Sequence, residues 1–314
     1  ALIERTLLSS GQAEQARTLA GMVVQKLGGK ASFAIGFSES GSALTAQLVG
    51  RGDPAFLVAQ DPAGTLGFDS RVRGASAIRQ QFGRWGVTGA IETGDALSRN
   101  AEAIPALRNR YRQYGYAKTQ LTLDRRFGPL AASVSGTRLA ERDTVLGAKF
   151  TDGLGGTRAV SYFLDVAARI DAGAGWSVGG SLRRGWSLAD VRGGVTGGGT
   201  IRTSAFAADI GKDALFGSRD SIGLRVSQPL RVSRGGIDLR LPTDYDYDTG
   251  AVTAWSMQTL NLAPTGRELD AELRYSVPVW LGQLQSNLFF RRNPGNFASL
   301  PDDKGAAVRW SMDF

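Results

Sequence analysis

The chain contains neither cysteine nor histidine in its 314 residues. Without cysteine it can form no disulfide framework, no thiolate nucleophile and no cysteine metal site. Without histidine it lacks the commonest general base, the commonest zinc ligand and every Ser-His or Cys-His nucleophile pair. These two absences predict a protein that is not an enzyme and that binds no metal or other cofactor.

Long apolar runs are also missing, since no stretch approaches the roughly 20 apolar residues that a spanning helix needs. Proline is scarce at 10 residues, whereas glycine is abundant at 42, a balance that suits many tight turns. The composition therefore predicts an all-β protein. All-β barrels reach this length as one domain, so the length alone does not require two.

Positive charge is present in excess, with 37 Lys and Arg against 29 Asp and Glu and a formal net charge of +8. Such an excess raises the question of nucleic-acid binding. The basic residues are scattered among the acids instead of gathered in one tract. We therefore interpret them as charges of a lumen and of loops, and we expect no nucleic-acid partner.

The last ten residues show a period of two. Val308, Trp310, Met312 and Phe314 alternate with polar residues, and the same pattern recurs at 266–277 and 158–171. Strict alternation predicts strands with one apolar and one polar face. A soluble β-sandwich would also show such strands. We keep it as a rival that would stay in aqueous buffer without detergent.

Twelve segments carry this pattern, and most have the length of a tilted membrane strand, about 9–11 residues. They lie at 30–39, 75–82, 85–93, 115–126, 129–139, 158–171, 175–187, 200–211, 219–230, 266–277, 282–292 and 305–314. The connections alternate between long and short along the chain. Such alternation is typical of an outer-membrane barrel with short periplasmic turns and long external loops.

The fold class that we predict is all-β, a twelve-stranded antiparallel transmembrane β-barrel with both of its ends periplasmic. Aromatic residues near the predicted strand ends fit a girdle at the membrane interface. They are Trp85, Trp176, Trp186, Tyr275, Trp280, Trp310 and Phe314. Residues 231–265 are expected to form an external hairpin, or two further membrane strands in a fourteen-strand alternative.

Residues 2–27 differ, because apolar residues recur there at three- and four-residue spacing and Gly28-Gly29 closes the run. This spacing predicts a helix that fills the barrel lumen. The predicted division is a lumen-plugging helix over 1–29 and a translocator barrel over 30–314. The chain begins without a signal peptide and is expected to be the carboxyl-terminal part of a longer precursor.

A lumen helix followed by twelve amphipathic strands resembles the translocator domain of autotransporters, the type V secretion proteins. Several motifs are similar to the barrels of subtilisin-like serine protease autotransporters from sphingomonad-type bacteria. They are Gly36-Phe37-Ser38, Asp53-Pro54-Ala55-Phe56-Leu57, Leu239-Arg240-Leu241-Pro242, Leu262-Ala263-Pro264-Thr265-Gly266-Arg267-Glu268 and Leu300-Pro301-Asp302-Asp303-Lys304-Gly305.

The resemblance implies a monomeric anchor and translocator in the bacterial outer membrane. Its partners would be outer-membrane lipid and lipopolysaccharide, the barrel assembly machinery and an amino-terminal passenger polypeptide. Val308, Trp310, Met312 and Phe314 would form the assembly signal. The chain holds neither the Asn-Asn pair at which some autotransporters cut themselves nor a protease triad. Any protease activity would belong to a missing passenger.

The strand at 266–277 puts three carboxylates, Glu268, Asp270 and Glu272, on one face. Such lumen acids normally pair with arginines such as Arg274, because unpaired charges away from water are costly. A sharper hypothesis is that they dock Arg5, Arg17 or Lys26 of the lumen helix. The alternative function is a channel, or porin, for small solutes. An outer-membrane enzyme is a further rival, which the missing histidine disfavours.

Overall fold

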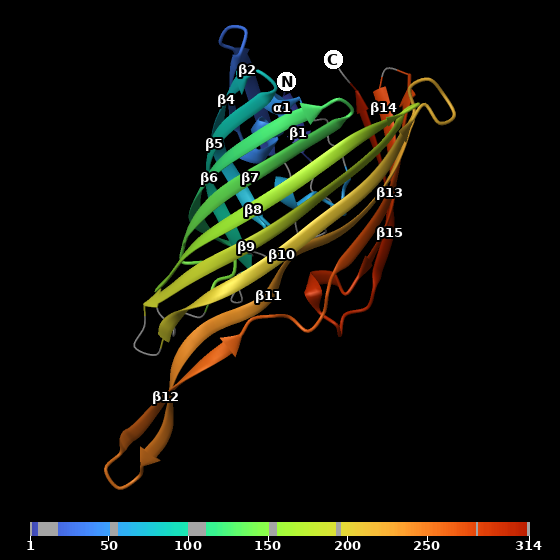
Figure 1. Ribbon diagram of the computed structural model, residues 1–314. Coiled ribbons are helices and arrows are strands. Elements are labelled where there is room, and N and C mark those ends of the chain that lie inside the picture. The colour runs from blue at the N-terminus through green and yellow to red at the C-terminus, as the bar shows by residue number, and fades with distance from the viewer. Residues whose placement is uncertain are drawn as a thin grey trace.

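A computed structural model gives the fold and describes residues 2–5, 18–50, 56–99, 111–150, 156–192, 196–280 and 282–312 (Figure 1). Within these residues fifteen strands form a single sheet, and every strand pairing is antiparallel. The one α-helix of the described residues is α1 (Gly41–Val49). The prediction of an all-β antiparallel fold is therefore confirmed.

Most of the strands have 11 residues or more. The strands are β1 (Leu2–Arg5), β2 (Thr18–Lys26), β3 (Ala31–Phe37), β4 (Ser70–Phe82), β5 (Trp85–Arg99), β6 (Tyr111–Phe127), β7 (Leu130–Arg142), β8 (Gly156–Gly173), β9 (Trp176–Arg192), β10 (Thr196–Asp213), β11 (Ser221–Asp246), β12 (Ala251–Asn261), β13 (Leu269–Val279), β14 (Gly282–Arg292) and β15 (Asp303–Met312). Two short 3₁₀ helices, η1 (Pro62–Gly64) and η4 (Pro294–Asn296), lie in connections.

The sheet is a meander. Consecutive strands pair from β1 to β11, and the order then continues through β13, β14 and β15. Each of the twelve predicted segments coincides with one of these strands, and β14 has the predicted bounds. The predicted total of twelve is not what the structure has, because β1, β2 and β12 bring the number to fifteen.

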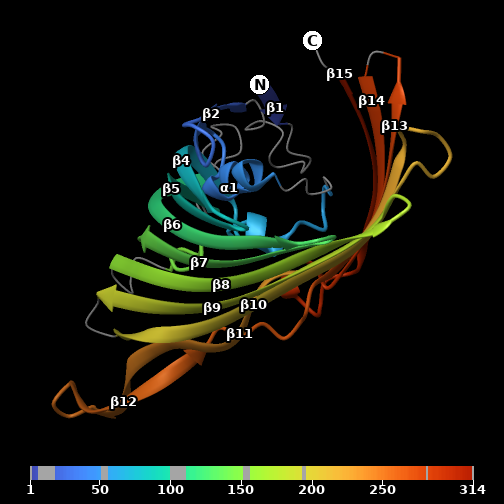
Figure 2. The ribbon, with the colours of Figure 1, turned by 45° about the horizontal axis from the view of Figure 1, so that its top comes forward.

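The sheet is strongly curved. Figure 2 shows it bending around α1, with the β1–β2 edge and β15 lying apart. Among the described residues no backbone pairing joins β15 to β1 or β2, so this sheet is open. A closed barrel therefore stays a prediction.

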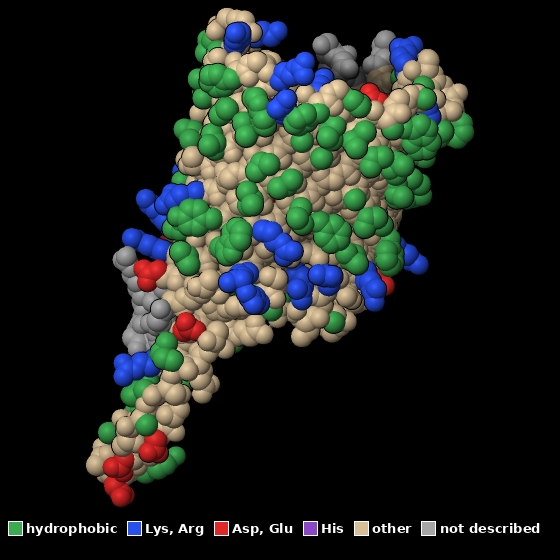
Figure 3. Space-filling model, viewed as in Figure 1, with side chains coloured by type: hydrophobic (Ala, Val, Ile, Leu, Met, Phe, Trp, Pro, Cys, Tyr) green, Lys and Arg blue, Asp and Glu red, His purple; other side chains and the backbone are tan. Residues whose placement is uncertain are grey.

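The two faces of the sheet have opposite character. On β6 the concave face carries Lys118, Gln120 and Thr122, all buried, while Leu121 and Leu123 on the convex face are exposed. The same alternation runs through the other long strands, and in Figure 3 hydrophobic side chains spread over the convex face. A water-soluble protein has the reverse arrangement, with apolar residues inside and polar residues outside.

The predicted helix over 2–27 is wrong where the structure describes it. Leu2–Arg5 and Thr18–Lys26 are strands, and Val23 on β2 lies opposite Ile35 on β3 in an unbroken register. Residues 6–17 lie outside the described residues. The apolar spacing that suggests a helix is outweighed here by pairing to a neighbouring strand, which a local pattern does not contain. The domain boundary at residue 29 stays a prediction.

Residues 231–265 contain a hairpin, which both alternatives predict, and its place outside the membrane or within it stays a prediction. The second half of β11 pairs with β12, and β12 pairs with no other strand. Figure 1 shows this hairpin projecting beyond the end of the sheet. Its tip, Tyr247 to Gly250, is a turn closed by a carboxylate, since Asp246 accepts from the Thr249 hydroxyl and from the Asp248 amide.

The final strand, β15, is present as predicted, and at this open edge Arg309 and Ser311 are exposed as well as Val308 and Trp310. Phe314 and Asp313 lie outside the described residues, and so does the side chain of Met312. The role of this strand as an assembly signal stays a prediction. Among the described residues, no helix combines the length and the apolar character needed to cross a membrane.

Candidate functional site: an inner segment anchored to the sheet

The connection between β3 and β4 lies inside the curve of the sheet (Figure 2). We call residues 38–69 the inner segment; the structure describes 38–50 and 56–69 of it, including α1 and η1. The sequence predicts a long external loop over 40–74, and the described part of that loop turns inward instead. The element inside the curve is therefore the connection between the third and fourth strands of the sheet.

Helix α1 has clear signals at both ends. The Ser40 hydroxyl accepts a hydrogen bond from the Ala43 amide at 3.0 Å, which satisfies one of the orphan amides of the first turn. At the other end Gly50 adopts a left-handed conformation with φ of 71°, which costs glycine little. The nine-residue helix is short, so contacts with the sheet must hold it in place.

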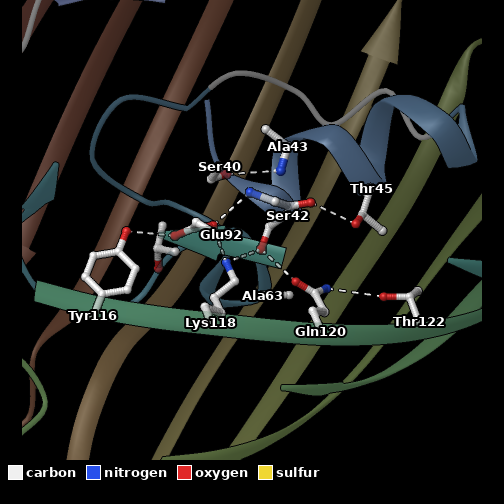
Figure 4. Close-up of polar contacts among 12 residues, drawn as sticks. Ser40, Ser42, Ala43, Thr45, Ala63, Glu92, Tyr116, Lys118, Gln120 and Thr122 are labelled. Atoms are coloured by element: carbon white, nitrogen blue, oxygen red, sulfur yellow. Dashed lines mark hydrogen bonds and ion pairs between the residues drawn. The ribbon is translucent and has the colours of Figure 1, made fainter. Parts of the chain in front are cut away.

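The first of these contacts is the carboxylate of Glu92 on β5 (Figure 4). It accepts hydrogen bonds from the Gly41 amide at 2.7 Å and from the Tyr116 hydroxyl at 2.8 Å, and forms an ion pair with Lys118 at 2.8 Å. All four side-chain and backbone groups are buried. A negative charge at a helix amino terminus is stabilised by the helix dipole, so Glu92 holds the helix and neutralises Lys118 at once.

A row of polar side chains continues from this carboxylate along the wall. Lys118 donates to the Ser42 hydroxyl at 3.0 Å, and that hydroxyl donates to Gln120 at 3.0 Å. Gln120 in turn donates to Thr122 at 3.2 Å, as Figure 4 shows. A cavity of about 80 Å³ lies between this side of the inner segment and strands β6 to β8.

The second anchor lies on the opposite wall, at Glu272 on β13. Its carboxylate is fully buried and accepts from three consecutive amides, those of Leu57 at 2.8 Å, Val58 at 2.7 Å and Ala59 at 2.9 Å. The Asn287 side chain on β14 donates to the same carboxylate. Hydrogen bonds to a charged group contribute about 1.5–3 kcal/mol each, so this contact fixes the segment firmly.

A third anchor is formed by Arg183 on β9. Its guanidinium binds Asp165 on β8 at 2.6 and 3.0 Å and donates to the carbonyl oxygen of Thr65. Beside it, the Ser181 hydroxyl donates to Asp61, the residue that caps η1, at 2.6 Å. The inner segment thus reaches β5 and β6, then β13, and then β8 and β9.

Apolar contacts complete the attachment. The Phe56 ring lies 4.4 Å from the Arg225 guanidinium and 5.9 Å from that of Arg274, distances at which cation–π attraction operates. Leu66 packs in a buried cluster with Tyr116, and this cluster also contains Leu139 and Phe163.

The three predicted carboxylates are all buried, Asp270 and Glu272 on β13 and Glu268 immediately before it. Glu268 and Asp270 form ion pairs with Arg291 at 3.3 and 3.4 Å, while Glu272 binds the inner segment. Arg274 donates to Ser221 at 3.3 Å. Arg5 lies in β1 and Lys26 in β2, and Arg17 lies outside the described residues. Docking of these basic residues to the carboxylates stays a prediction.

On the side of the short turns the concave face is basic. Arg79, Arg84, Arg126 and Arg169, which we call the basic vestibule, line a cavity of about 620 Å³ together with the end of α1 and Asp124. Arg79 binds Asp124 through both terminal guanidinium nitrogens, and Arg169 pairs with Asp209 at 2.7 Å. Arg84 and Arg126 are exposed and form no ion pair with another described residue.

Sequence patterns alone did not identify several of these residues as part of the site. Ser40 and Gly50 are cap signals ten residues apart and would have located α1. Nothing local marks Glu92 or Arg183, since their partners are distant in the chain. The described residues contain no cluster of three metal-ligating side chains. The expectations of no cofactor and no enzymatic activity stay predictions.

No protein-family model matches the chain, and no curated protein matches it. Among solved structures it is similar to that titled "High pH structure of Pseudomonas putida OprB", with 14% sequence identity and a TM-score of 0.42. The similarity covers 93% of this chain and 71% of that one. Because the TM-score is below 0.5, the likeness assigns neither fold nor function to this chain.

Proposed function

We propose that the chain forms a membrane-spanning barrel in a bacterial outer membrane and acts as a channel for small solutes that the inner segment narrows. The observation that carries the proposal is the inverted sheet, with exposed leucine, isoleucine and valine outside and buried charged residues inside. A soluble monomer rarely exposes a contiguous apolar surface as large as the convex face of this sheet. Such a face is the expected outer surface of a barrel in lipid.

Closure of the sheet follows from the same proposal. The free edges of β15 and β1 present unpaired amide and carbonyl groups, each of which would cost several kcal/mol in hydrocarbon. Pairing of β15 with the first strands would remove both edges. The curvature in Figure 2 brings the sheet most of the way round α1, which supports closure in a membrane.

The position of the lumen element favours a channel over a translocator. The resemblance to autotransporters implies that the segment before the first wall strand lies in the lumen and is joined there to the exported passenger. Here Thr18–Lys26 is itself a wall strand, paired with β3 from Gly21 to Lys26. The lumen element is a connection fixed at both ends, so no passenger would follow from it. The translocator remains the second candidate, on the resemblance alone.

The test is conductance of the full chain in planar bilayers. Since the sequence has no cysteine, one introduced cysteine gives a unique label. A charged, water-soluble thiol reagent should block current through Arg126→Cys, on the concave face of β6. The matched control, Leu121→Cys, places the thiol on the convex face of the same strand and should leave the current unchanged.

Replacing residues 41–66 by a short glycine-serine linker should raise the conductance, because it removes the element that fills the lumen. A full chain that inserts but conducts no current, with or without this replacement, would contradict the channel. Partition of the chain into buffer without detergent would contradict the membrane location and favour the soluble β-sandwich.

A further inference from the structure

Three arginines stand together on the convex face of the sheet. Trp186 on β9 lies opposite Arg202 on β10, and Arg202 lies opposite Arg234 on β11. Arg184 is two residues from Trp186 on the same strand and faces Ser204, diagonal to Arg202. We call Arg184, Arg202 and Arg234 the outer arginine cluster.

The side chains of this cluster point away from the lumen. Arg202 stands between Ile201 and Thr203, which are both buried on the concave face, and Arg184 follows buried Arg183. All three arginines are exposed. Their guanidinium groups form no ion pair or hydrogen bond with another described residue.

Such an arrangement is unfavourable by itself. Residues directly opposite on antiparallel strands have Cβ atoms about 4.5–5.5 Å apart, and diagonal neighbours lie about 7–8 Å apart. Like charges at these distances repel, and lipid nearby lowers the screening. A shared anion would reverse the sign of the interaction, because it would attract all three groups.

The surroundings indicate which anion. Arg184 lies between exposed Leu182 and half-exposed Trp186 on β9, so the cluster adjoins the apolar face. In Figure 3 Lys and Arg side chains gather along the lower boundary of the hydrophobic area. Tryptophan is enriched where hydrocarbon meets headgroups. An anion bound here must therefore sit at the level of lipid headgroups.

We propose that the outer arginine cluster binds the phosphate group of a membrane lipid. The proposal rests on the membrane location proposed above. Guanidinium groups donate two parallel hydrogen bonds to phosphate oxygens, a geometry that lysine does not provide. Acyl chains of the same lipid would lie on the apolar face beside the cluster, and Trp186 would flank the headgroup. Arg202 is nearer the start of β10 than its end, on the side of the long β3–β4 and β5–β6 connections, so the lipid would belong to the outer leaflet.

The experiment measures lipid retention by native mass spectrometry. The full chain in detergent micelles is incubated with lipid A, a phosphorylated glucosamine lipid, or with phosphatidylcholine. We expect retention of lipid A by the wild type. The variant Arg202→Gln/Arg234→Gln should bind it about tenfold or more weakly, because each charge-assisted hydrogen bond lost costs more than 1.4 kcal/mol. The control Lys30→Gln/Arg219→Gln, which removes two charges from exposed short turns, should bind as the wild type does.

A second variant keeps the test valid if the first folds poorly. Arg202→Glu places an acid opposite Arg234, so it should weaken lipid A binding while leaving the fold stable. Equal retention by both variants and the wild type would overturn the proposal, and so would displacement of lipid A by inorganic phosphate. Bilayer conductance is measured in parallel. If the variants retain lipid A as the wild type does and the conductance is normal, this inference alone is wrong. If the full chain does not insert into the bilayer, the channel proposal is wrong.

Discussion

Glu272 on β13 accepts a hydrogen bond from the Leu57 amide at 2.8 Å, although 215 positions separate them in the chain. The contact joins a wall strand near the end of the sequence to a connection near its beginning. It also gives one buried acid of the concave face a structural role, since Glu272 fixes the inner segment inside the curve of the sheet.

Glu272→Gln should loosen the inner segment. The variant brings an amide group with its own donors against three backbone donors and removes the charge that they share, at about 1.5–3 kcal/mol per hydrogen bond to a charged group. We expect higher and noisier single-channel conductance and a lower unfolding midpoint. Glu268→Gln is the control, because Glu268 binds Arg291 and the Gly295 amide and not the inner segment. Equal conductance in both variants would show that Glu272 does not restrain the lumen.

Arg84→Glu/Arg126→Glu should change the ion preference. Positive charge without a partner at the mouth of a pore attracts anions and repels cations, so the wild type is expected to pass chloride more readily than potassium. The variant should shift the reversal potential in a potassium chloride gradient toward that of potassium. Arg84→Lys/Arg126→Lys keeps the charge and should keep the wild-type potential. An unchanged potential in the glutamate variant would place the selecting charges elsewhere.

A charged side chain introduced on the convex face should lower the unfolding free energy, and by more the deeper it lies in the membrane. Leu121 is exposed on β6, six residues before Phe127, where the strand ends. Leu121→Arg should lower the unfolding free energy by about 2–4 kcal/mol, while Phe127→Arg should cost about 0–1 kcal/mol near the interface. Urea unfolding in phosphatidylcholine vesicles measures both. Similar small costs at the two positions would mean that this face is not in lipid.

The turn between β10 and β11 should make stability depend on pH. Burial raises the pKa of Asp220, but the amides of Phe216 and Gly217, the Tyr275 hydroxyl and the Leu215 amide outweigh it, so the pKa lies below its usual range. A lowered folded-state pKa gives stability that is complete above the unfolded-state value, about 3.9, and lost as the pH falls through the folded value. Asp220→Asn should therefore be less stable than the wild type at pH 7.

The same pair compared at decreasing pH supplies the control. The difference between the wild type and Asp220→Asn in unfolding midpoint should shrink below pH 4, as the wild-type carboxylate takes up its proton. A difference that stays constant with pH would mean that the carboxylate acts through shape and not through charge.

Twelve strands of this chain can be predicted from its sequence because each carries its own alternating pattern. In β14 every second residue from Leu284 to Arg292 faces outward, and the predicted bounds 282–292 hold. Period-two alternation is a local property, so no knowledge of the neighbouring strand is needed. The same is true of the hairpin of β11 and β12, whose turn residues lie between its strands.

The inner segment could not be placed in the same way. Its caps, Ser40 and Gly50, predict a helix but do not show whether the segment turns into the curve of the sheet or away from it. Its anchors Glu92 and Glu272 lie far along the chain. The helix prediction for residues 18–26 is wrong for a related reason. Leu19, Ala20, Val23 and Val24 fit a helical face as well as a strand, and only pairing with β3 decides between them.

The three anchors of the inner segment also set an order of assembly. Glu92 is on β5, Arg183 on β9 and Glu272 on β13, so the receptor for residues 38–69 exists only when nearly the whole sheet is in register. These are contacts of long sequence separation, which form late because their loop-closure entropy must first be offset by other contacts. The inner segment can therefore dock only on a sheet whose strands are in register, since slipped strands would not bring these three charged side chains to the positions that it contacts.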